Sequence, residues 1–326
     1  MHRRMLLAGA GAVCSAIPWR AARADLPDRT LSIIVPTVPG GTTDILGRLI
    51  AQTMAEALGR TIVVENVGGA GGLLGMQRTV RAPVDGGTLL VGNQGILLAA
   101  PLLLPGPGFD AQRDLRPVGI FGEVPAALAA SRASGIRSMA EFMERARARP
   151  ARLTLGVSGV GAATHLAAAA LIEAADLRVT LVPYRGGGQS MTDLAAGTID
   201  LAMELAPGII AAAAGGHAVP LAVGGRDRVR ELPGVPTFTE TGIADYPGIV
   251  WYALMAPAAA SDVAVATYAA AMGRALHGRA LLSRFHDLAV TPPPETMQGP
   301  EPLRRLLAED GAKIGDLVRA GRIREN

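Results

Sequence analysis

The sequence predicts an α/β protein of two lobes with a cleft between them, and three observations support this fold class. Short apolar runs alternate with helix-periodic segments, an order that favours parallel strands with helices on both faces of a sheet. The pattern restarts after an extended stretch over residues 118–131, which indicates a second α/β unit. Glycine-rich loops follow several predicted strands, and in parallel sheets such loops form the ligand crevice. The 326 residues suffice for two domains.

The chain order places the elements in three stretches after residues 1–24. Residues 25–125 form the first part of lobe 1, with strands at 31–36, 61–65 and 88–91 and helices at 43–58 and 71–81. Residues 126–223 form lobe 2, with helices at 138–149, 162–174 and 188–196 and strands at 153–157, 179–182, 199–203 and 219–223. Residues 224–326 return to lobe 1, with a strand at 250–255 and helices at 261–277 and 301–320. This order predicts mostly parallel sheets and two crossovers, near residues 124–131 and 223–226, that form a two-strand hinge.

Residues 1–24 have the features of a secretory signal peptide. Arg3 and Arg4 precede an apolar stretch, and Ala22-Arg23-Ala24 matches an Ala-x-Ala cleavage site. The arginine pair fits either a Sec signal or a twin-arginine signal. No later segment has the run of about 18 apolar residues that a membrane-spanning helix needs. We therefore expect a periplasmic protein whose mature chain begins at Asp25.

The composition argues against several kinds of chemistry. Residues 1–24 hold four of the 31 basic groups and none of the 28 acidic groups, so their removal changes the net charge from +3 to −1. Nucleic-acid binding is therefore not expected. The only cysteine, Cys14, leaves with the signal peptide, and the histidines lack metal-ligand spacing. We expect neither a metal site nor a cofactor.

The first glycine-rich loop is the strongest candidate for a ligand site. It contains Gly40, Gly41, Thr42 and Thr43, followed by Asp44, and it lies between a predicted strand and a predicted helix. Glycines leave backbone N–H groups open, and a helix N-terminus adds partial positive charge, so an anion fits here without an arginine. The alternative is a plain turn in which the carboxylate only favours the helix dipole.

Two later loops supply further candidates. Ser158 lies between a strand and a helix, as in a nucleophile elbow, but Val160 replaces the glycine that this motif needs. His165 lies seven residues further on, along the following helix, which makes an exported serine hydrolase the weakest hypothesis. Arg185, in a second glycine-rich loop, either pairs with an anion or lies solvated at the surface.

Taken in order, the motifs resemble those of the Bug-type periplasmic receptors, the substrate-binding components of tripartite tricarboxylate transporters. The resemblance covers essentially the whole mature chain, and the ordered set is far more specific than any one motif. The motifs are Ile34-Val35-Pro36, Pro39-Gly40-Gly41, Asp44, Val64-Glu65-Asn66, Gly69-Ala70-Gly71-Gly72, Asp85-Gly86, Gly159, Gly161, His165-Leu166-Ala167, Val182-Pro183-Tyr184-Arg185-Gly186, Thr192-Asp193-Leu194, Asp200-Leu201 and Leu232-Pro233.

The resemblance implies a type II periplasmic-binding-protein fold and a receptor rather than an enzyme. Such a receptor holds a small organic carboxylate through backbone amides, helix N-termini and hydroxyls, and delivers it to membrane permease subunits. The ligand-binding residues expected in this chain are Gly40, Gly41, Thr42, Thr43, Asp44, Gln94, Ser158, Gly161, Ala162, Thr164, Arg185, Gly186, Gly187 and Glu204.

Four positions depart from the family's usual pattern. Val160 and Ala162 stand where a polar residue and a threonine are usual, Gln94 lies in a loop where small hydroxyl residues are common, and Glu204 replaces an aspartate. The cleft is therefore expected to be more apolar than in its relatives. This favours a monocarboxylate with an apolar or aromatic body over citrate.

Two roles stay open at this point. A transporter receptor delivers its ligand to a permease, whereas a ligand sensor signals to a membrane histidine kinase without transport. A permease gene beside this one would distinguish them. A LysR-type effector domain shares the fold but begins with DNA-binding helices, where this chain has a signal peptide. A monomer is expected in either role.

Overall fold

The computed structural model describes residues 26–104, 108–243, 248–321 and 323, so the expected signal peptide lies outside the described residues. Within these ranges the strands are β1 (Leu31–Val35), β2 (Ile62–Asn66), β3 (Thr88–Asn93), β4 (Leu115–Ser131), β5 (Thr154–Val157), β6 (Thr180–Pro183), β7 (Leu201–Leu205), β8 (Ala218–Val223) and β9 (Ile249–Pro257). The α-helices are α1 (Thr42–Leu58), α2 (Leu73–Val80), α3 (Ala100–Leu103), α4 (Ala111–Asp114), α5 (Met139–Ala148), α6 (Ala163–Ala174), α7 (Gly187–Ala196), α8 (Ala206–Ala214), α9 (Asp262–Leu276), α10 (Arg279–Asp287) and α11 (Pro300–Arg319). A π-helical turn, η2 (Gly95–Ala99), precedes α3.

The strands form a mixed sheet in the order β2-β1-β3-β9-β4-β7-β5-β6, with β8 paired to β4. Parallel pairing occurs within each unit, where β1 pairs with β2 and β3, and β5 pairs with β6 and β7. At the centre β4 and β9 run antiparallel to their neighbours. The expectation of mostly parallel sheets is therefore wrong there, because β9 enters from a distant part of the chain without a helical crossover.

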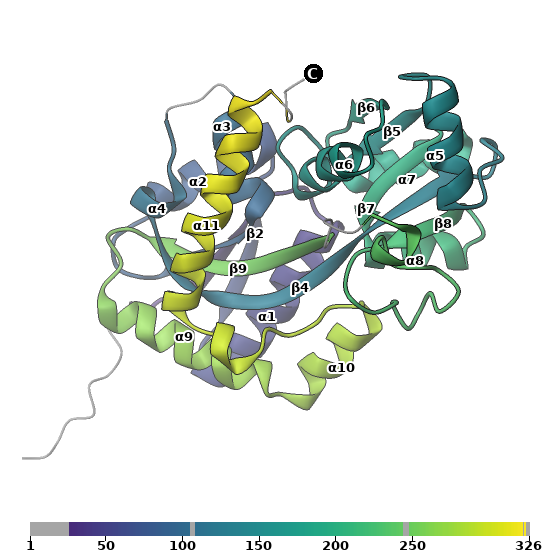
Figure 1. Ribbon diagram of the computed structural model, residues 1–326. Helices are drawn as coiled ribbons and strands as arrows, with labels where there is room; N and C mark the ends of the chain where they lie inside the picture. The colour runs from purple at the N-terminus through teal and green to yellow at the C-terminus, as the bar shows by residue number, and fades with distance from the viewer. Residues whose placement is uncertain (1–25, 105–107, 244–247, 322, 324–326) are drawn as a thin grey trace, which may run out of the picture.

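The long strand β4 belongs to both lobes (Figure 1). Its residues 115–125 pair with β9, and its residues 126–131 pair with β7 and β8. We call the part that contains β1, β2, β3 and β9 the first lobe, and the part that contains β5 to β8 the second lobe. One covalent connection between the lobes is thus a continuous strand.

The chain returns to the first lobe later than the sequence suggests. After β8 it stays beside the second lobe: the Val223 N–H donates to the Pro236 carbonyl at 3.0 Å, and the Phe238 N–H donates to the Val223 carbonyl at 2.9 Å. Val229 and Leu232 are buried against the second lobe's core. These apolar side chains keep residues 224–238 on the second lobe, so the return comes with β9 and not near residues 223–226.

Helices cover both faces of each lobe. In β1 the buried side chains alternate, so Ile33 and Val35 join the apolar cluster under α1, α9 and α10, whereas Ile34 joins the cluster under α2 and α11. The second lobe has α5 and α6 on one face and α7 and α8 on the other. Helix α10, which buries Leu281 and Phe285, is absent from the sequence prediction. No described helix is long and apolar enough to cross a bilayer.

Candidate functional site

A cavity of about 890 Å³ lies between the two lobes. Its first-lobe wall includes the loops after β1 and β2, the end of β3 and Tyr252 of β9. Its second-lobe wall consists of the segments after β5, β6 and β7, so the cavity lies at the carboxyl ends of parallel strands. The structure brings together most of the candidate ligand residues in its lining: Gly40, Gly41, Thr42, Thr43, Ser158, Ala162, Thr164, Arg185, Gly186, Gly187 and Glu204. Asp44, Gln94 and Gly161 lie outside the lining.

The N-termini of four helices, α1, α6, α7 and α8, converge on this cavity. None of them has a side-chain cap, although serines cap α5 and α9 elsewhere in the molecule. Helices α10 and α11 also start uncapped, so the convergence, and not the missing cap alone, distinguishes the cavity. Unbonded N–H groups and helix dipoles make it attractive to an anion. The four N-cap residues, all in the lining, are Gly41, Ala162, Gly186 and Leu205.

Asp44 supports the first loop from behind the cavity. Its carboxylate accepts hydrogen bonds from the Gly40 N–H at 3.0 Å, from the Arg48 guanidinium at 3.1 Å and from the Asn66 amide at 2.8 Å. Burial acts to raise the pKa of Asp44, but the hydrogen bonds from Arg48, Gly40 and Asn66 outweigh it and lower that pKa. These bonds hold Asp44 outside the cavity lining, where it supports the loop, and its expected ligand contact stays a prediction.

Gln94 also has a structural partner. Its amide N–H donates to the Ile249 carbonyl at 3.0 Å, and its carbonyl accepts from the Trp251 N–H at 3.1 Å. The side chain therefore joins the end of β3 to the start of β9. The family's loop position suggested a ligand contact, but these two backbone bonds occupy both ends of the amide.

Gly161 lies at the contact between the lobes. It has φ +74°, and a Cβ added there would lie 2.7 Å from the Ala100 Cα. Its N–H donates to the His165 imidazole at 3.1 Å, and burial lowers the pKa of that histidine. Glycine is required here for both the backbone conformation and the close approach of the first lobe.

Ser158 lines the cavity without a general base. Its hydroxyl lies 2.6 Å from the Thr164 hydroxyl, and Thr164 Oγ1 also accepts the Ser158 N–H at 2.8 Å. His165, the nearest histidine in sequence, is bonded to Gly161 instead. The arrangement fits two hydroxyls that hold a helix start, and it lacks the serine–histidine bond of a hydrolase. Among the described residues no group of His, Cys, Asp or Glu could hold a metal ion.

Sequence reasoning missed several residues of the lining. Tyr252, on β9, is fully buried, and its hydroxyl lies 3.2 Å from the Thr43 hydroxyl. Asn93 accepts the Ile96 N–H at 3.0 Å, and the Thr37 hydroxyl is buried without a hydrogen-bond partner in the described structure. The pairing of β9 with β3 brings Tyr252 opposite Asn93. No local sequence signal reveals that long-range pairing, whereas Thr37, next to Pro36, could have been found in the first loop.

Glu204 is the second-last residue of β7, the strand before α8. The sequence predicts that this strand begins two residues too early. The Asp200 carboxylate accepts hydrogen bonds from the Thr154 N–H and hydroxyl at 2.9 Å, and Asp200 therefore precedes the strand. Glu204 is therefore within β7, and its side chain is buried at the cavity. One carboxyl oxygen accepts the Leu205 N–H at 2.9 Å.

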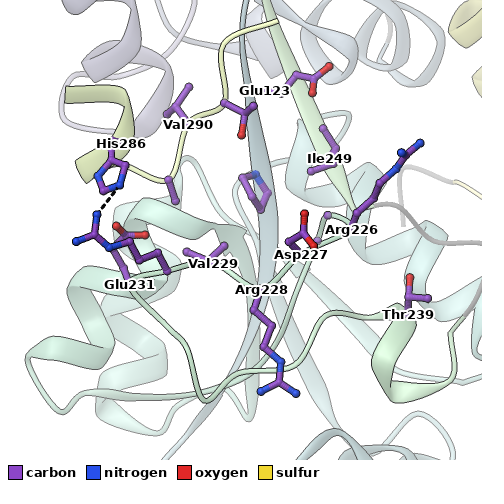
Figure 2. A pocket seen from close by; sticks show the side chains of 16 residues that line it. Glu123, Arg226, Asp227, Arg228, Val229, Glu231, Thr239, Ile249, His286 and Val290 are labelled. Atoms are coloured by element: carbon purple, nitrogen blue, oxygen red, sulfur yellow. Dashed lines mark hydrogen bonds between the residues drawn. The ribbon is translucent and has the colours of Figure 1, made fainter. Parts of the chain in front are cut away.

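A second cavity, of about 900 Å³, lies beside the hinge (Figure 2). Glu123 from β4, the loop that carries Arg228 and Arg230, and His286 from α10 line it. Arg228 pairs with Glu240, and the Arg230 guanidinium donates to the His286 ring nitrogen at 2.6 Å. Two of its three arginines thus have protein partners, and the wall also contains the carboxyl groups of Glu123, Asp227 and Glu231, so we place the anion site in the interlobe cavity.

Known proteins of one family match this chain. A family model described as "Tripartite tricarboxylate transporter family receptor" matches residues 46–322. Protein BugT of Bordetella pertussis is 30% identical over 298 residues, which are 90% of this chain and 89% of that protein. The structure of MatC from Rhodopseudomonas palustris with bound malate is 30% identical, has a TM-score of 0.83, and covers 90% of this chain and 100% of its own. A second R. palustris protein, solved with adipate, is 28% identical with a TM-score of 0.83 over 90% and 97% of the two chains.

Proposed function

Because the chain belongs to the tripartite tricarboxylate transporter receptor family, we propose that it captures a small carboxylate between its lobes and delivers it to a membrane permease. Members of this family are periplasmic binding receptors. The observation that carries the proposal is the convergence of four uncapped helix N-termini on one cavity. The malate and adipate bound to two relatives support a carboxylate as the ligand class.

The expected hydrogen bonds are sufficient for useful affinity. A hydrogen bond to a charged group contributes about 1.5–3 kcal/mol. A micromolar ligand needs about 8 kcal/mol in total. Three or four bonds from the backbone amides and hydroxyls of both lobes, with apolar burial, supply this after the costs of association. An arginine is then unnecessary, and Arg185, the cationic residue of the lining, is exposed.

The ligand's body is proposed to be apolar. Beyond the helix starts, the cavity is lined by Met191, Ala211, Ala212 and Leu288 from the second lobe and from α10. We therefore favour a monocarboxylate with an aliphatic or aromatic body, which would place its carboxylate at the helix N-termini and its body against these side chains.

Gly41→Val provides the direct test. Gly41 has an ordinary extended φ of −82°, and a Cβ there meets no atom within 4 Å, so valine fits the backbone and projects into open space. After a thermal-shift screen of organic acids, calorimetry should show that Gly41→Val abolishes binding of the best acid while the melting temperature is kept. Arg185→Ala, the comparison variant, should bind with little loss. If Arg185→Ala abolished binding and Gly41→Val did not, a salt bridge would hold the carboxylate, and its assignment to the helix N-termini would be wrong.

A further inference from the structure

One buried carboxyl group in the cavity wall has an oxygen without a partner. Glu204 is 8% exposed. Its Oε1 accepts the Leu205 N–H, whereas its Oε2 is buried and has no hydrogen-bond partner in the described structure. A Cβ added to Gly187, at the start of α7, would lie 2.0 Å from Oε2. Oε2 therefore lies against the same helix N-terminus that faces the ligand space.

Burial favours the neutral form of Glu204, whereas the nearby N-terminus of α7 acts in the opposite direction. No described Lys, Arg or His forms an ion pair with it. The other titratable side chains in the cavity lining are Tyr252 from β9, which interacts with Glu204, and Tyr184 and Arg185 from the loop before α7. Tyr184 donates to Asp193 at 2.7 Å, and Arg185 is exposed. Burial raises the pKa of Glu204 to about 7, although the Leu205 N–H acts to lower it.

We propose that Glu204 is a neutral acid in the complex and that its Oε2–H donates a hydrogen bond to the ligand's carboxylate. This inference rests on the proposed function, because it needs a carboxylate in this cavity. In a neutral acid the carbonyl oxygen accepts and the hydroxyl donates. Oε1 already accepts the Leu205 N–H, which leaves Oε2 as the donor. An ionised Glu204 would instead place two like charges in one cavity.

The consequence is that binding takes up a proton from solvent. Only protein with neutral Glu204 is competent, so the apparent affinity follows the competent fraction. With a pKa of about 7, the affinity should fall about 30-fold between about pH 6 and pH 8.5. Near pH 8.5 close to one proton should enter per ligand bound, and near pH 6 almost none.

The test is calorimetry on the mature chain with four probes: malate, adipate, hexanoate and benzoate. Titrations at both pH values, each in buffers of different ionisation enthalpy, measure affinity and proton uptake in wild-type protein without any substitution. Glu204→Gln keeps the size and one donor but cannot ionise, so it should bind a probe with nearly the low-pH affinity at both pH values. Glu240→Gln, at an exposed carboxyl paired with Arg228, is the matched control and should keep the wild-type pH dependence.

The outcomes separate this inference from the proposed function. A probe that binds with the same affinity at both pH values, and without proton uptake, overturns the inference and leaves carboxylate capture intact. An affinity that rises with pH and is lost in Glu204→Gln shows an ionised acceptor for a hydroxyl or ammonium group, and also overturns it. If none of the probes, nor any acid from the screen, binds at either pH, the proposed function fails and the inference with it.

Discussion

Gly95 of the first lobe and Ala163 of the second lobe pack backbone against backbone. A Cβ added to Gly95 would lie 2.3 Å from the Ala163 nitrogen, closer than any side chain tolerates. Gly161 meets Ala100 in the same contact, at 2.7 Å from its Cα. Gly95 and Gly161 thus allow the start of α6, one of the four helix N-termini, to pack closely against η2 and Ala100. The cavity depends on this contact because it positions α6 over the first lobe.

Gly95→Ala should hinder this contact between the lobes. Overpacking a close contact costs about 1–3 kcal/mol. Since 1.4 kcal/mol is a factor of ten, ligand affinity should fall by about 5- to 150-fold. Gly273→Ala, in α9, where a Cβ meets only Gln298 at 3.9 Å, should bind normally. Calorimetry measures the affinity, and X-ray scattering should show that ligand decreases the radius of gyration of the control more than that of Gly95→Ala. Wild-type affinity in Gly95→Ala would contradict this role.

The raised pKa of Glu204 predicts that the free energy of unfolding decreases as pH rises. Burial raises its folded-state pKa from 4.5 to about 7. Below pH 4.5 Glu204 is protonated in both the folded and the unfolded chain, so the folded protein loses no stability through it. Between these values only the unfolded chain ionises, so stability falls by about 3 kcal/mol as pH rises to 7, and then stays constant.

Glu204→Gln removes this loss because glutamine does not titrate. The variant should melt at a higher temperature than wild type at about pH 8, and the difference should vanish near pH 4.5. Thermal melts by circular dichroism across this range provide the measurement. Glu240→Gln should show no such convergence. An equal melting-temperature difference at both ends of the range would mean that Glu204 ionises normally in the folded protein.

Export predicts a defined N-terminus. Ala22-Arg23-Ala24 places the cleavage site before Asp25. N-terminal sequencing of protein from the periplasmic fraction should therefore begin at Asp25. Recovery of the full-length chain from the cytoplasm alone would contradict export. Arg3→Lys with Arg4→Lys should stop export if the signal is of the twin-arginine type and leave it unchanged if the signal is of the Sec type.

The sequence predicts the local elements of this fold well and its central pairing poorly. Helix α1 has an apolar residue pattern of helical period, and β3 is a short apolar run, so their positions follow from nearby residues. The antiparallel insertion of β9 between β3 and β4 depends on contacts between segments far apart in the chain. A hydrophobic run predicts a strand but not the strand with which it pairs, so Tyr252 was absent from the predicted site.

Most site residues predicted for their backbone lie in the cavity lining, whereas two that were predicted for their side chains lie outside it. Gly41 and Gly186 reach the cavity because a glycine-rich loop at a strand's end exposes its backbone whatever the neighbours do. Asp44, from the same loop as Gly41, and Gln94, from the loop after β3, were also expected in the site, but their side chains bond to Arg48 and to β9. Motif position therefore places a residue near the site, whereas the direction of its side chain depends on partners that only the fold supplies.

Asp44→Asn should reveal the support that Asp44 gives to the ligand loop. The side chain is 6% exposed and accepts from Gly40, Arg48 and Asn66. Asparagine keeps the shape but loses the charge and one acceptor, so unfolding free energy should fall by about 1–3 kcal/mol near pH 7. Ligand affinity should also fall, because the Gly40 N–H is no longer held. Asp316→Asn, at an exposed carboxyl paired with Arg319, should change neither quantity measurably.

The pH dependence of this variant distinguishes lost charge from altered packing. The folded-state pKa of Asp44 is lowered: burial opposes the change, but the bonds from Arg48, Gly40 and Asn66 outweigh it. A lowered pKa means that Asp44 stabilises the fold above its ordinary value of 3.8, and that this contribution disappears as pH falls through the folded-state pKa. Urea unfolding should therefore show a large difference between wild type and Asp44→Asn at about pH 7 and a smaller one at about pH 3. A difference that stays constant with pH would assign the effect to shape, and a variant as stable as wild type at pH 7 would show that the carboxylate does not hold the loop.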